Sequence, residues 1–367
     1  MEEKARIGNF EAFCLLLNMI CAKIVLDFPR VVSEDVGSAA WIMIFLDTVV
    51  VFIFFKIIAR LYDNFSGKDL IDISEIALKK VGKIIVGVIL VIQFMYMTSI
   101  TLREFAEDIK VISLTITPIS VVITLFCIAM VVGAYLGIGT ICRVYALVVP
   151  ILTASLTMIL LLNSPRFDIS KLSPWLGLGI ETILKKGLTS LSHFSEIIVI
   201  LLIAPFLNNK KSFAGIGRWG IILSGFFLAM STTCYLLVYQ YPTSTEFFLP
   251  MYQMARTISF GRFFTRIESA FIFIWALTAF LYLSSSLYFI TYIFQRIFNL
   301  KYRRPLITPF IVLLFTLSIL PENLYSTLQI EMQVYSRFSW IIAIILPTIL
   351  IAIASLRTRK NRGVENK

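Results

Sequence analysis

The amino-acid sequence predicts an all-α polytopic membrane protein with about ten transmembrane helices and little chain outside the bilayer. Of its 367 residues, 58% are hydrophobic and 15% are charged, and the mean hydropathy is +0.88. Soluble globular chains are nearer one half apolar and one quarter charged, so the excess apolar surface is expected to face lipid. The apolar residues also gather in runs near the length of about 20 residues that a helix needs to cross a bilayer. No strand pattern competes, and in lipid a helix satisfies its own backbone hydrogen bonds.

Ten apolar runs give the expected spans in order. The first run begins near Phe10, and no small-residue cleavage site follows it, so we interpret it as a retained span rather than a signal peptide. The runs leave only short connections, which predicts a single transmembrane domain over residues 1–367. The expected spans are 10–31, 38–60, 84–109, 118–136, 141–162, 188–207, 216–239, 267–296, 306–320 and 338–356.

The distribution of positive charge predicts the orientation. With ten spans, the loops that share a side with the N-terminus hold about twice as many Lys and Arg residues as the loops of the other side, which favours both termini in the cytoplasm. The net charge of +11 is spread over many loops. We therefore interpret it as a topology signal, and we expect no nucleic-acid partner.

Three segments outside the spans have patterns of their own. Residues 69–82 alternate apolar and charged side chains at helical spacing, which predicts an interfacial helix on the cytoplasmic side. Residues 240–266 form the longest outer connection and mix aromatic residues with Arg, so we expect a partly helical outer cap. Residues 357–367 are expected to be a basic cytoplasmic tail beside anionic lipid.

The sequence favours neither an enzyme nor a metal protein. It contains no GxSxG, HExxH or GxxxxGK[ST] motif, and its single histidine, His193, excludes a site built from several histidines. The five cysteines lie in or beside apolar runs without a CxxC pair, which indicates core thiols. We therefore expect no enzymatic activity and no cofactor. The cysteines are Cys14, Cys21, Cys127, Cys142 and Cys234.

Several charged residues stand inside the expected spans. An ionised side chain at bilayer depth costs about 2.5–3.5 kcal/mol on insertion scales, so each needs a partner or a water-filled cavity. Lys23 lies four residues before Asp27 and could pair with it along one helix, or could neutralise Asp47 or Glu196 on other spans. Structural pairing and a functional role both remain open for these residues. Glu104 stands in the third span.

The first and sixth spans both combine charge with signals that break a helix. Pro29 follows Lys23 and Asp27 in the first span, and Pro205 closes the sixth, which carries His193 and Glu196. The two spans lie five apart, which is the pattern of a 5+5 inverted repeat with its first helices broken. The repeats are expected at about 10–162 and 188–356. In such an arrangement the breaks face each other at the midplane, where helix N-termini attract a carboxylate, and the third and eighth spans complete the pocket.

Four stretches resemble a known family. They are LDFPR at the end of the first span, LREFAEDIKVISLTITP, FSEIIVILLIAPF, and FLPMYQMARTISFGRFFTRIESAFIFIW. Together they are similar to the B subunit of spore germinant receptors, the spore germination permease family of the amino acid/polyamine/organocation transporter superfamily. The resemblance implies a LeuT-like fold and the sensing of a small-molecule germinant at the spore inner membrane. It also implies two partners, the germinant receptor A subunit and a C subunit lipoprotein.

The resemblance implies a set of site residues by position. The ligand-binding set is Cys21, Ala22, Lys23, Gln93, Tyr96, His193, Glu196, Tyr282 and Ser286. For an ion- or water-conducting variant of the same fold, the polar and ionisable side chains inside the spans give the candidate path Asp47, Thr101, Glu104 and Glu196. The family often has a Gly-x-Gly-like break in the first span, where this chain has Cys21-Ala22-Lys23. Without glycine the open backbone is less accessible. Lys23 is then expected either to bind a ligand carboxylate or to replace a coupling cation.

The expected function is that of a nutrient-germinant sensing subunit. Its ligand, for which an amino acid is the first candidate, would bind between spans 1, 3, 6 and 8 and signal to the partner subunits by favouring one of two conformations. The alternative is an amino acid or amine transporter, or an ion- or water-conducting permease, of the same fold.

Overall fold

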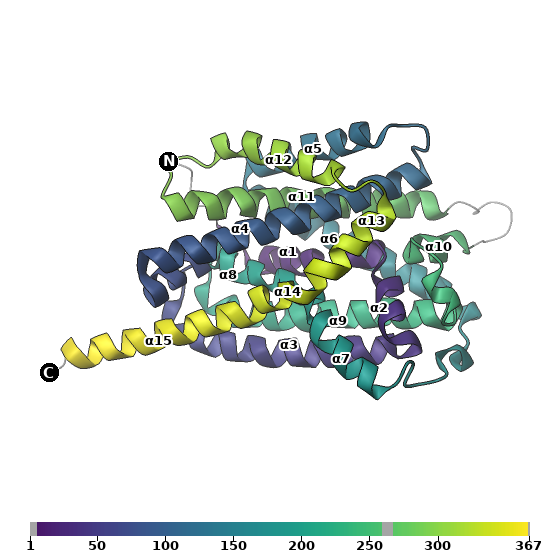
Figure 1. Ribbon diagram of the computed structural model, residues 1–367, viewed down its shortest axis with the longest axis horizontal. Helices are drawn as coiled ribbons and strands as arrows, with labels where there is room; N and C mark the ends of the chain where they lie inside the picture. The colour runs from purple at the N-terminus through teal and green to yellow at the C-terminus, as the bar shows by residue number, and fades with distance from the viewer. Residues whose placement is uncertain (1–5, 259–266, 366–367) are drawn as a thin grey trace.

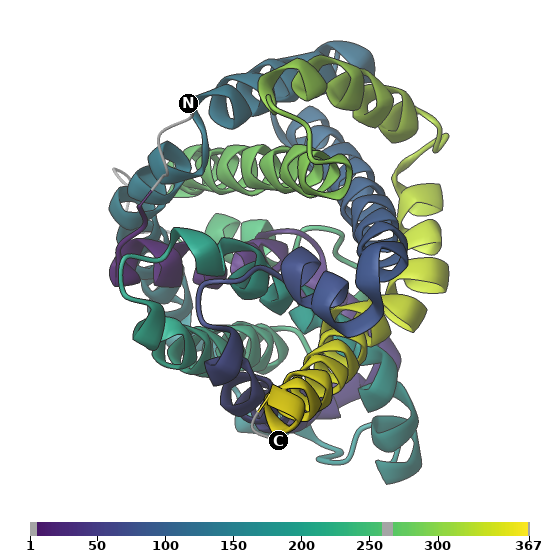
Figure 2. The ribbon, with the colours of Figure 1, turned by 90° about the vertical axis from the view of Figure 1, so that its left-hand side faces the viewer.

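The computed structural model describes residues 6–258 and 267–365, which form an elongated bundle of helices (Figure 1). Seen from its end, the bundle has most helices running along the line of sight (Figure 2). No strand occurs in these two ranges. The α-helices are α1 Asn9–Cys21, α2 Phe28–Val36, α3 Ala40–Tyr62, α4 Leu70–Ile112, α5 Ile119–Leu136, α6 Ile138–Leu162, α7 Ile180–Ser190, α8 Val199–Ile203, α9 Phe213–Val238, α10 Pro250–Arg256, α11 Ile267–Phe298, α12 Ile307–Ile319, α13 Leu324–Ile330, α14 Ser336–Trp340 and α15 Leu346–Glu365.

The predicted ten-span membrane fold is confirmed. Within the described residues, eight helical stretches are long and apolar enough to cross a bilayer, and Arg304–Ile319 forms a shorter ninth. The first of the eight stretches, Phe28–Phe65, begins with α2, and α1 precedes it; α1 and α2 are the two pieces of the first span and α3 is the second, which completes the set of ten. Large apolar side chains such as Ile53 and Leu125 are about half exposed on the outside of the bundle, as expected of a surface that faces lipid.

The packing follows the expected inverted repeat. The second and seventh spans pack together as α3 and α9, the third and eighth as α4 and α11, and the fourth and ninth as α5 and α12. The first span meets the sixth where α1 contacts the short helical segments between α7 and α9. The first four spans of one repeat thus pack on their counterparts in the other, whereas the fifth span, α6, packs on α1 and α11, and the tenth packs through α15 on α4 and α3. The first and sixth spans meet at the centre of this arrangement.

The first span is broken at its middle. A 3₁₀ turn, η1 (Ala22–Val25), follows α1, and the backbone at Leu26 leaves the helical region before α2 begins. Pro29 stands in the first turn of α2, where its missing N–H leaves no helical hydrogen bond unmade. The break therefore lies between Val25 and Phe28, where the charged and proline residues predicted it.

The sixth span is also irregular at its centre. It begins as α7, continues as the 3₁₀ segment η6 (Leu191–Ile198) and ends as α8 and η7 (Ala204–Phe206). A 3₁₀ run of this length is uncommon, because its hydrogen bonds have poorer geometry than those of an α-helix. The expected start near 188 is too late, since α7 begins at Ile180. Glycine and charged residues between 180 and 188 interrupt the apolar pattern, so the sequence made the sixth span look shorter than it is.

The tenth span is longer than the sequence predicted. Its helical course runs from Leu324 to Glu365 and contains two π-helical segments, η11 (Glu331–Tyr335) and η12 (Ile341–Ile345). The expected start at 338 is therefore wrong. Polar residues between 325 and 337 resemble a loop in sequence, but packing on α4 and η6 holds them in the helix. The π segments turn Glu331 and Tyr335 towards the centre of the bundle.

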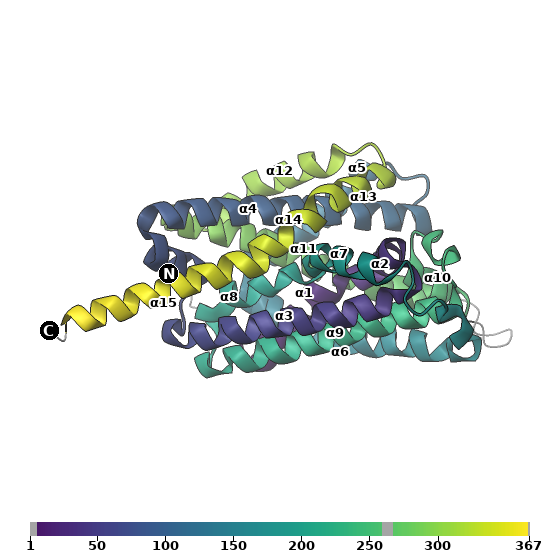
Figure 3. The ribbon, with the colours of Figure 1, turned by 60° about the horizontal axis from the view of Figure 1, so that its bottom comes forward.

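The connecting segments and the ends of the spans lie at the two ends of the bundle. Both chain termini lie at one end, and α10 lies at the other, together with α2 of the first span and α7 of the sixth (Figures 1 and 3). The helix expected at 69–82 is the start of α4, which changes direction at Lys79, where φ is 63°. In the expected cap, η9 (Thr243–Thr245) and α10 are described, and residues 259–266 lie outside the described residues. α15 extends through the expected tail as far as Glu365.

Candidate functional site

A cavity lies where the two irregular spans face each other. Its walls come from η1 and α2 of the first span, α4 of the third, η6 of the sixth, α11 of the eighth and η11 of the tenth. The cavity is small, with a solvent-accessible volume of about 40 Å³, which is room for a few water molecules. The charged side chains at its walls are Lys23, Asp27, Glu104, Glu196 and Glu331.

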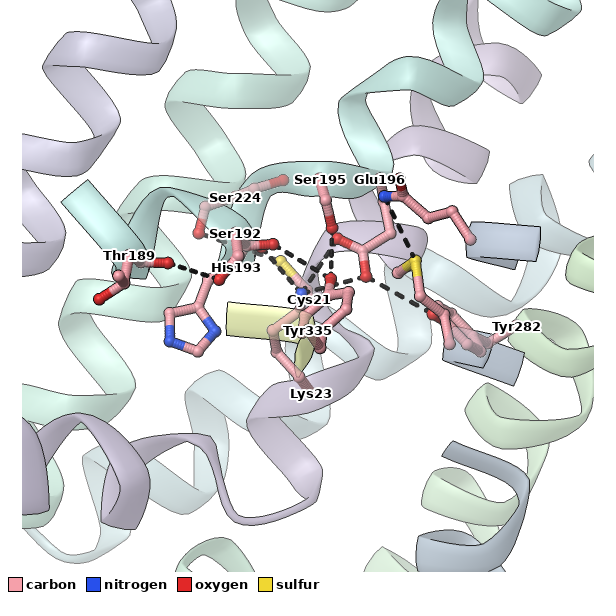
Figure 4. Close-up of polar contacts among 12 residues, drawn as sticks. Cys21, Lys23, Thr189, Ser192, His193, Ser195, Glu196, Ser224, Tyr282 and Tyr335 are labelled. Atoms are coloured by element: carbon pink, nitrogen blue, oxygen red, sulfur yellow. Dashed lines mark hydrogen bonds and ion pairs between the residues drawn. The ribbon is translucent and has the colours of Figure 1, made fainter. Parts of the chain in front are cut away.

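Lys23 joins the first span to the sixth across this cavity (Figure 4). Its Nζ donates to both carboxylate oxygens of Glu196, at 3.1 and 3.0 Å, and to the backbone carbonyl of His193 at 2.8 Å. The Lys23 side chain is 16% exposed and that of Glu196 is 3% exposed, so this ion pair is largely withdrawn from solvent. Of the partners that the sequence left open for Lys23, the structure selects Glu196.

Two tyrosines extend the polar contacts around the pair (Figure 4). The Tyr282 hydroxyl lies 3.5 Å from Glu196 Oε1 and also shares a hydrogen bond with Thr101. The Tyr335 hydroxyl donates to the Ser192 carbonyl at 3.1 Å and contacts the Ser195 hydroxyl. The backbone and hydroxyl groups of η6 are thereby held by the tenth span. Movement of η6 would change both sets of contacts at once.

Carboxyl groups continue from the cavity towards the end of the bundle opposite the termini. Glu104 is 4% exposed, and both Glu104 and Glu331 line the cavity. Glu104 Oε1 and Asp27 Oδ2 have no hydrogen-bond partner among the described residues. A smaller cavity, with Asp27, Glu104 and Asp108 among its lining residues, adjoins the main cavity at this point.

Seven of the residues expected at the site line the main cavity. They come from four different spans and are separated by up to 260 positions along the chain, so only the fold brings them together. His193 also packs edge-on against Phe28 of α2, with ring centroids 4.9 Å apart. The seven are Ala22, Lys23, Thr101, Glu104, His193, Glu196 and Tyr282.

The other five expected residues lie outside the cavity wall. Cys21 is on the opposite side of η1, and Ser286 donates to the Tyr282 carbonyl of its own helix. Gln93 contacts Met97 one turn further along α4, and Tyr96 donates to the Ile330 carbonyl at 2.7 Å. Asp47 accepts a hydrogen bond from Ser190 between α3 and α7. Tyr96 thus supports the tenth span behind the cavity.

The sequence interpretation missed the contribution of the tenth span. Glu331, Met332, Tyr335 and Ser336 line the cavity, yet this stretch was expected to be an outer loop. Glu331 and Tyr335 are four residues apart, which places them on one face of a helix. That spacing, in a stretch without Gly or Pro between Leu324 and Trp340, is the signal that could have found them.

Comparison with solved structures shows which fold this is. The chain superposes on MhsT, crystallised in complex with L-phenylalanine, with a TM-score of 0.70 and 15% identity over 93% of this chain and 88% of the other. It superposes on a nucleobase-cation-symport-1 family transporter in a closed conformation, with bromovinylhydantoin bound, with a TM-score of 0.66 and 10% identity over 96% and 91% of the two chains. The expected LeuT-like fold is therefore confirmed.

Comparison of sequences shows the family. The chain is 24% identical to spore germination protein KB of Bacillus subtilis (strain 168) over 78% of its own length and 77% of the relative. It is 23% identical to spore germination protein YndE of the same organism over 97% and 98% of the two chains. The model of the spore germination protein family, the spore permeases, matches residues 6–327. The chain therefore belongs to the family of spore germination proteins, as the resemblance in its first, third and sixth spans predicted.

Proposed function

We propose that this protein is the ligand-binding subunit of a spore germinant receptor and that an amino acid binds at the Lys23–Glu196 pair. The observation that carries the proposal is this ion pair, which bridges the breaks of the first and sixth spans in a mostly buried cavity. An amino acid is a zwitterion, so it carries one group of opposite charge for Lys23 and one for Glu196. A ligand carboxylate would replace Glu196 at the Lys23 ammonium, and a ligand ammonium would replace Lys23 at the Glu196 carboxylate.

Ligand binding would separate the two broken spans. The Lys23–Glu196 pair joins η1 to η6 directly. A ligand inserted between the two side chains would break this contact and would form one contact with Lys23 and another with Glu196. The contacts of Tyr335 with Ser192 and Ser195 would transmit this change to the tenth span. A ligand signals only if it binds one arrangement more tightly than the other, and a bridge that must open supplies that difference. The expected recipients are the receptor A subunit and the C subunit lipoprotein at the spore inner membrane.

The shared fold supports the ligand class. MhsT was crystallised with L-phenylalanine, and the present chain has the same arrangement of helices. A cavity of about 40 Å³ is too small for such a side chain in this conformation. The cavity must therefore widen for any ligand larger than a few waters, in keeping with a site that opens when it binds.

The test is binding of radiolabelled amino acids to the purified protein, followed by germination of spores that carry the same variants. Loss of binding and of germination to one nutrient in Lys23→Ala and Glu196→Gln, with Lys185→Ala on the exposed face of α7 behaving as wild type, would support the proposal. Unchanged affinity in Lys23→Ala would refute it.

A permease that conducts ions or water is the second candidate, and the chain of carboxyl groups favours it. Glu104 connects the main cavity to the smaller cavity at Asp27 and Asp108. Thr101 and Glu196 lie on the same route, whereas Asp47 lies between α3 and α7, away from it. Flux through proteoliposomes that depends on Glu104, without any amino-acid binding at Lys23, would favour this candidate.

A further inference from the structure

Another cavity, with a mostly apolar lining, lies on the other face of η1 from the main cavity at Lys23 and is called the second cavity below. Ala22 and Lys23 line the main cavity, whereas Ile24 and Val25, together with Cys21, line the second. The remaining walls of the second cavity come from α1, α6, α9 and α11. The single 3₁₀ turn of the first span is therefore the partition between the two cavities. Whatever fills the second cavity contacts the back of the turn that carries Lys23.

Two residues that line this second cavity carry buried N–H donors without partners. Asn18 and Trp275 are among its lining residues and are 4% and 2% exposed. Asn18 Nδ2 and Trp275 Nε1 have no hydrogen-bond partner among the described residues. Leaving a buried donor unsatisfied costs the full desolvation of that group. Both atoms donate only, so the missing partner is an acceptor such as a hydroxyl, ether or carbonyl oxygen.

The rest of the lining excludes a charged ligand. The described residues that line this cavity include no Asp, Glu, Lys, Arg or His, and most are aliphatic or aromatic. An ion placed there would lose its hydration without a counter-charge, which is strongly unfavourable. An alkyl chain would contact Leu17, Leu152 and Leu156 and would gain by burial.

The second cavity continues into a groove on the lipid-facing surface. Thr153 of α6 and Phe227 of α9 line both the cavity and this groove. The groove also runs along Met158 and Leu161, which are 56% and 64% exposed on the outside of the bundle. α6 packs mainly on α1, α11 and α5, and α9 mainly on α3 and α1, so the groove follows the line between them. The cavity thus adjoins the lipid-facing surface between α6 and α9, on the side of η1 away from the main cavity.

We propose that the second cavity binds an uncharged amphiphile from the bilayer, with one alkyl chain and one oxygen acceptor, as in a long-chain alcohol. The acceptor oxygen takes hydrogen bonds from Asn18 Nδ2 and Trp275 Nε1, and the alkyl chain extends between α6 and α9 into the groove. The site does not depend on the amino-acid site for its chemistry, because its donors, lining and entrance are different. The bound amphiphile contacts the turn Ala22–Val25 on the face opposite Lys23 and supports its conformation.

The experiment is photolabelling of the purified full-length protein in detergent with a diazirine-bearing octanol, with the adducts mapped by mass spectrometry. Adducts are expected on residues 149–156 and around Trp275, and decanol is expected to displace the probe more strongly than decane or decanoate. Trp275→Phe keeps the ring but removes the donor, and is expected to lower labelling about fivefold, the effect of one hydrogen bond. Trp219→Phe, at a ring that is 60% exposed on α9, is the matched control and is expected to label as wild type.

A second pair of variants keeps the test valid if the donors prove necessary for folding. Ser155→Phe fills the cavity and is expected to abolish the adducts, whereas Val144→Phe places the same ring at an exposed position of α6 and is expected to preserve them. Weaker labelling in phospholipid nanodiscs than in detergent would identify a lipid chain as the natural source of the same chemistry. Equal displacement by decane, or adducts that are unchanged in Ser155→Phe, would overturn the proposal.

Discussion

At the scale of single residues, the Lys23–Glu196 pair combines structure and proposed function. Both side chains are mostly buried, and Lys23 also holds the His193 carbonyl in η6. Removal of one partner of a buried pair leaves the other charge uncompensated, whereas an apolar replacement of both is much better tolerated. The same residues therefore resist single substitution even where no ligand is present.

We expect Lys23→Met to lower the free energy of unfolding by about 3 kcal/mol, because Glu196 then remains buried without its cation. The double variant Lys23→Met, Glu196→Leu is expected to recover most of this loss. Thermal unfolding of the purified protein in detergent measures both. A double variant no more stable than the single one would show that the pair does not act as a unit.

Tyr335 is the residue through which the tenth span holds the sixth. We expect Tyr335→Phe to weaken amino-acid binding several-fold, since it frees the Ser192 carbonyl and the Ser195 hydroxyl while preserving the ring. Tyr325→Phe, at a ring 61% exposed on the same span, is the control. Binding of labelled amino acid to the two variants compares them, and equal affinities would remove the tenth span from the proposed signal.

At the scale of elements, small residues allow the second and seventh spans to pack closely. A Cβ at Gly217 of α9 would overlap the ring of Phe55 on α3, whereas a Cβ at Gly215 would meet nothing within 4 Å. In lipid the close approach of helices contributes much of their attraction. The glycines of α9 thus set the distance between the two repeats at this contact.

These two glycines give a matched prediction. Gly217→Leu is expected to destabilise the protein by about 1–3 kcal/mol through overpacking, and Gly215→Leu to be neutral or slightly stabilising because leucine favours a helix. The fraction that remains monodisperse after heating reports the difference. Equal loss in both variants would mean that α3 can move away from α9 without cost.

The start of the third span is fixed at the end of the bundle that carries the termini. Asp69 is fully buried, caps α4 by accepting from Asp72 N at 2.7 Å, and also accepts from Tyr292 at 2.6 Å and from Arg296 at 3.0 Å. The cap and the contacts to α11 use the same carboxylate, so the third and eighth spans are joined where α4 begins.

Asp69→Ala is therefore expected to cost about 2–4 kcal/mol, more than the loss of a helix cap alone, because it also leaves Tyr292 without its acceptor and Arg296 with Asp72 as its remaining partner. Asp63→Ala in the preceding 3₁₀ turn is the control. Chemical denaturation in mixed micelles measures both variants, and an equal, small effect would show that solvent replaces the carboxylate at this end.

At the scale of the whole molecule, the arrangement of spans and the family relationship agree. Both termini lie at one end of the bundle, which an even number of crossings requires, and the excess of basic loops predicts that this end faces the cytoplasm. The fold that the chain shares with solved transporters agrees with a molecule built of two packed repeats. The sensing role, the partners and the spore inner membrane remain proposals that rest on the family.

The orientation itself can be measured. A cysteine introduced at Asn209, between η7 and α9, is expected to react with a membrane-impermeant maleimide only after the membrane is permeabilised. A cysteine at Ser170, between α6 and α7, is expected to react in intact cells. The reverse pattern would invert the orientation, and it would place the cavity mouth at Asp27 on the cytoplasmic side.

The sequence by itself determined the class of fold, the number of spans and the positions of both breaks. These properties follow from local composition, because the length of an apolar run, a proline and an ionisable residue in lipid each act on the helix that contains them. The charges in the first and sixth spans were enough to predict that Lys23, His193 and Glu196 lie near one another. The resemblance added Thr101 and Tyr282.

Only the tertiary structure decided which charge Lys23 pairs with and which residues close the cavity. Asp27, Asp47 and Glu196 were equal candidates in the sequence, and the crossing of η1 and η6 selected Glu196. Glu331 and Tyr335 were missed because polar residues in a late span look like a loop until packing on α4 and η6 shows their partners. The partition between the two cavities likewise follows from how helices pack, since residues adjacent in η1 face opposite cavities only once α6 and α9 stand on one side and α4 and η6 on the other.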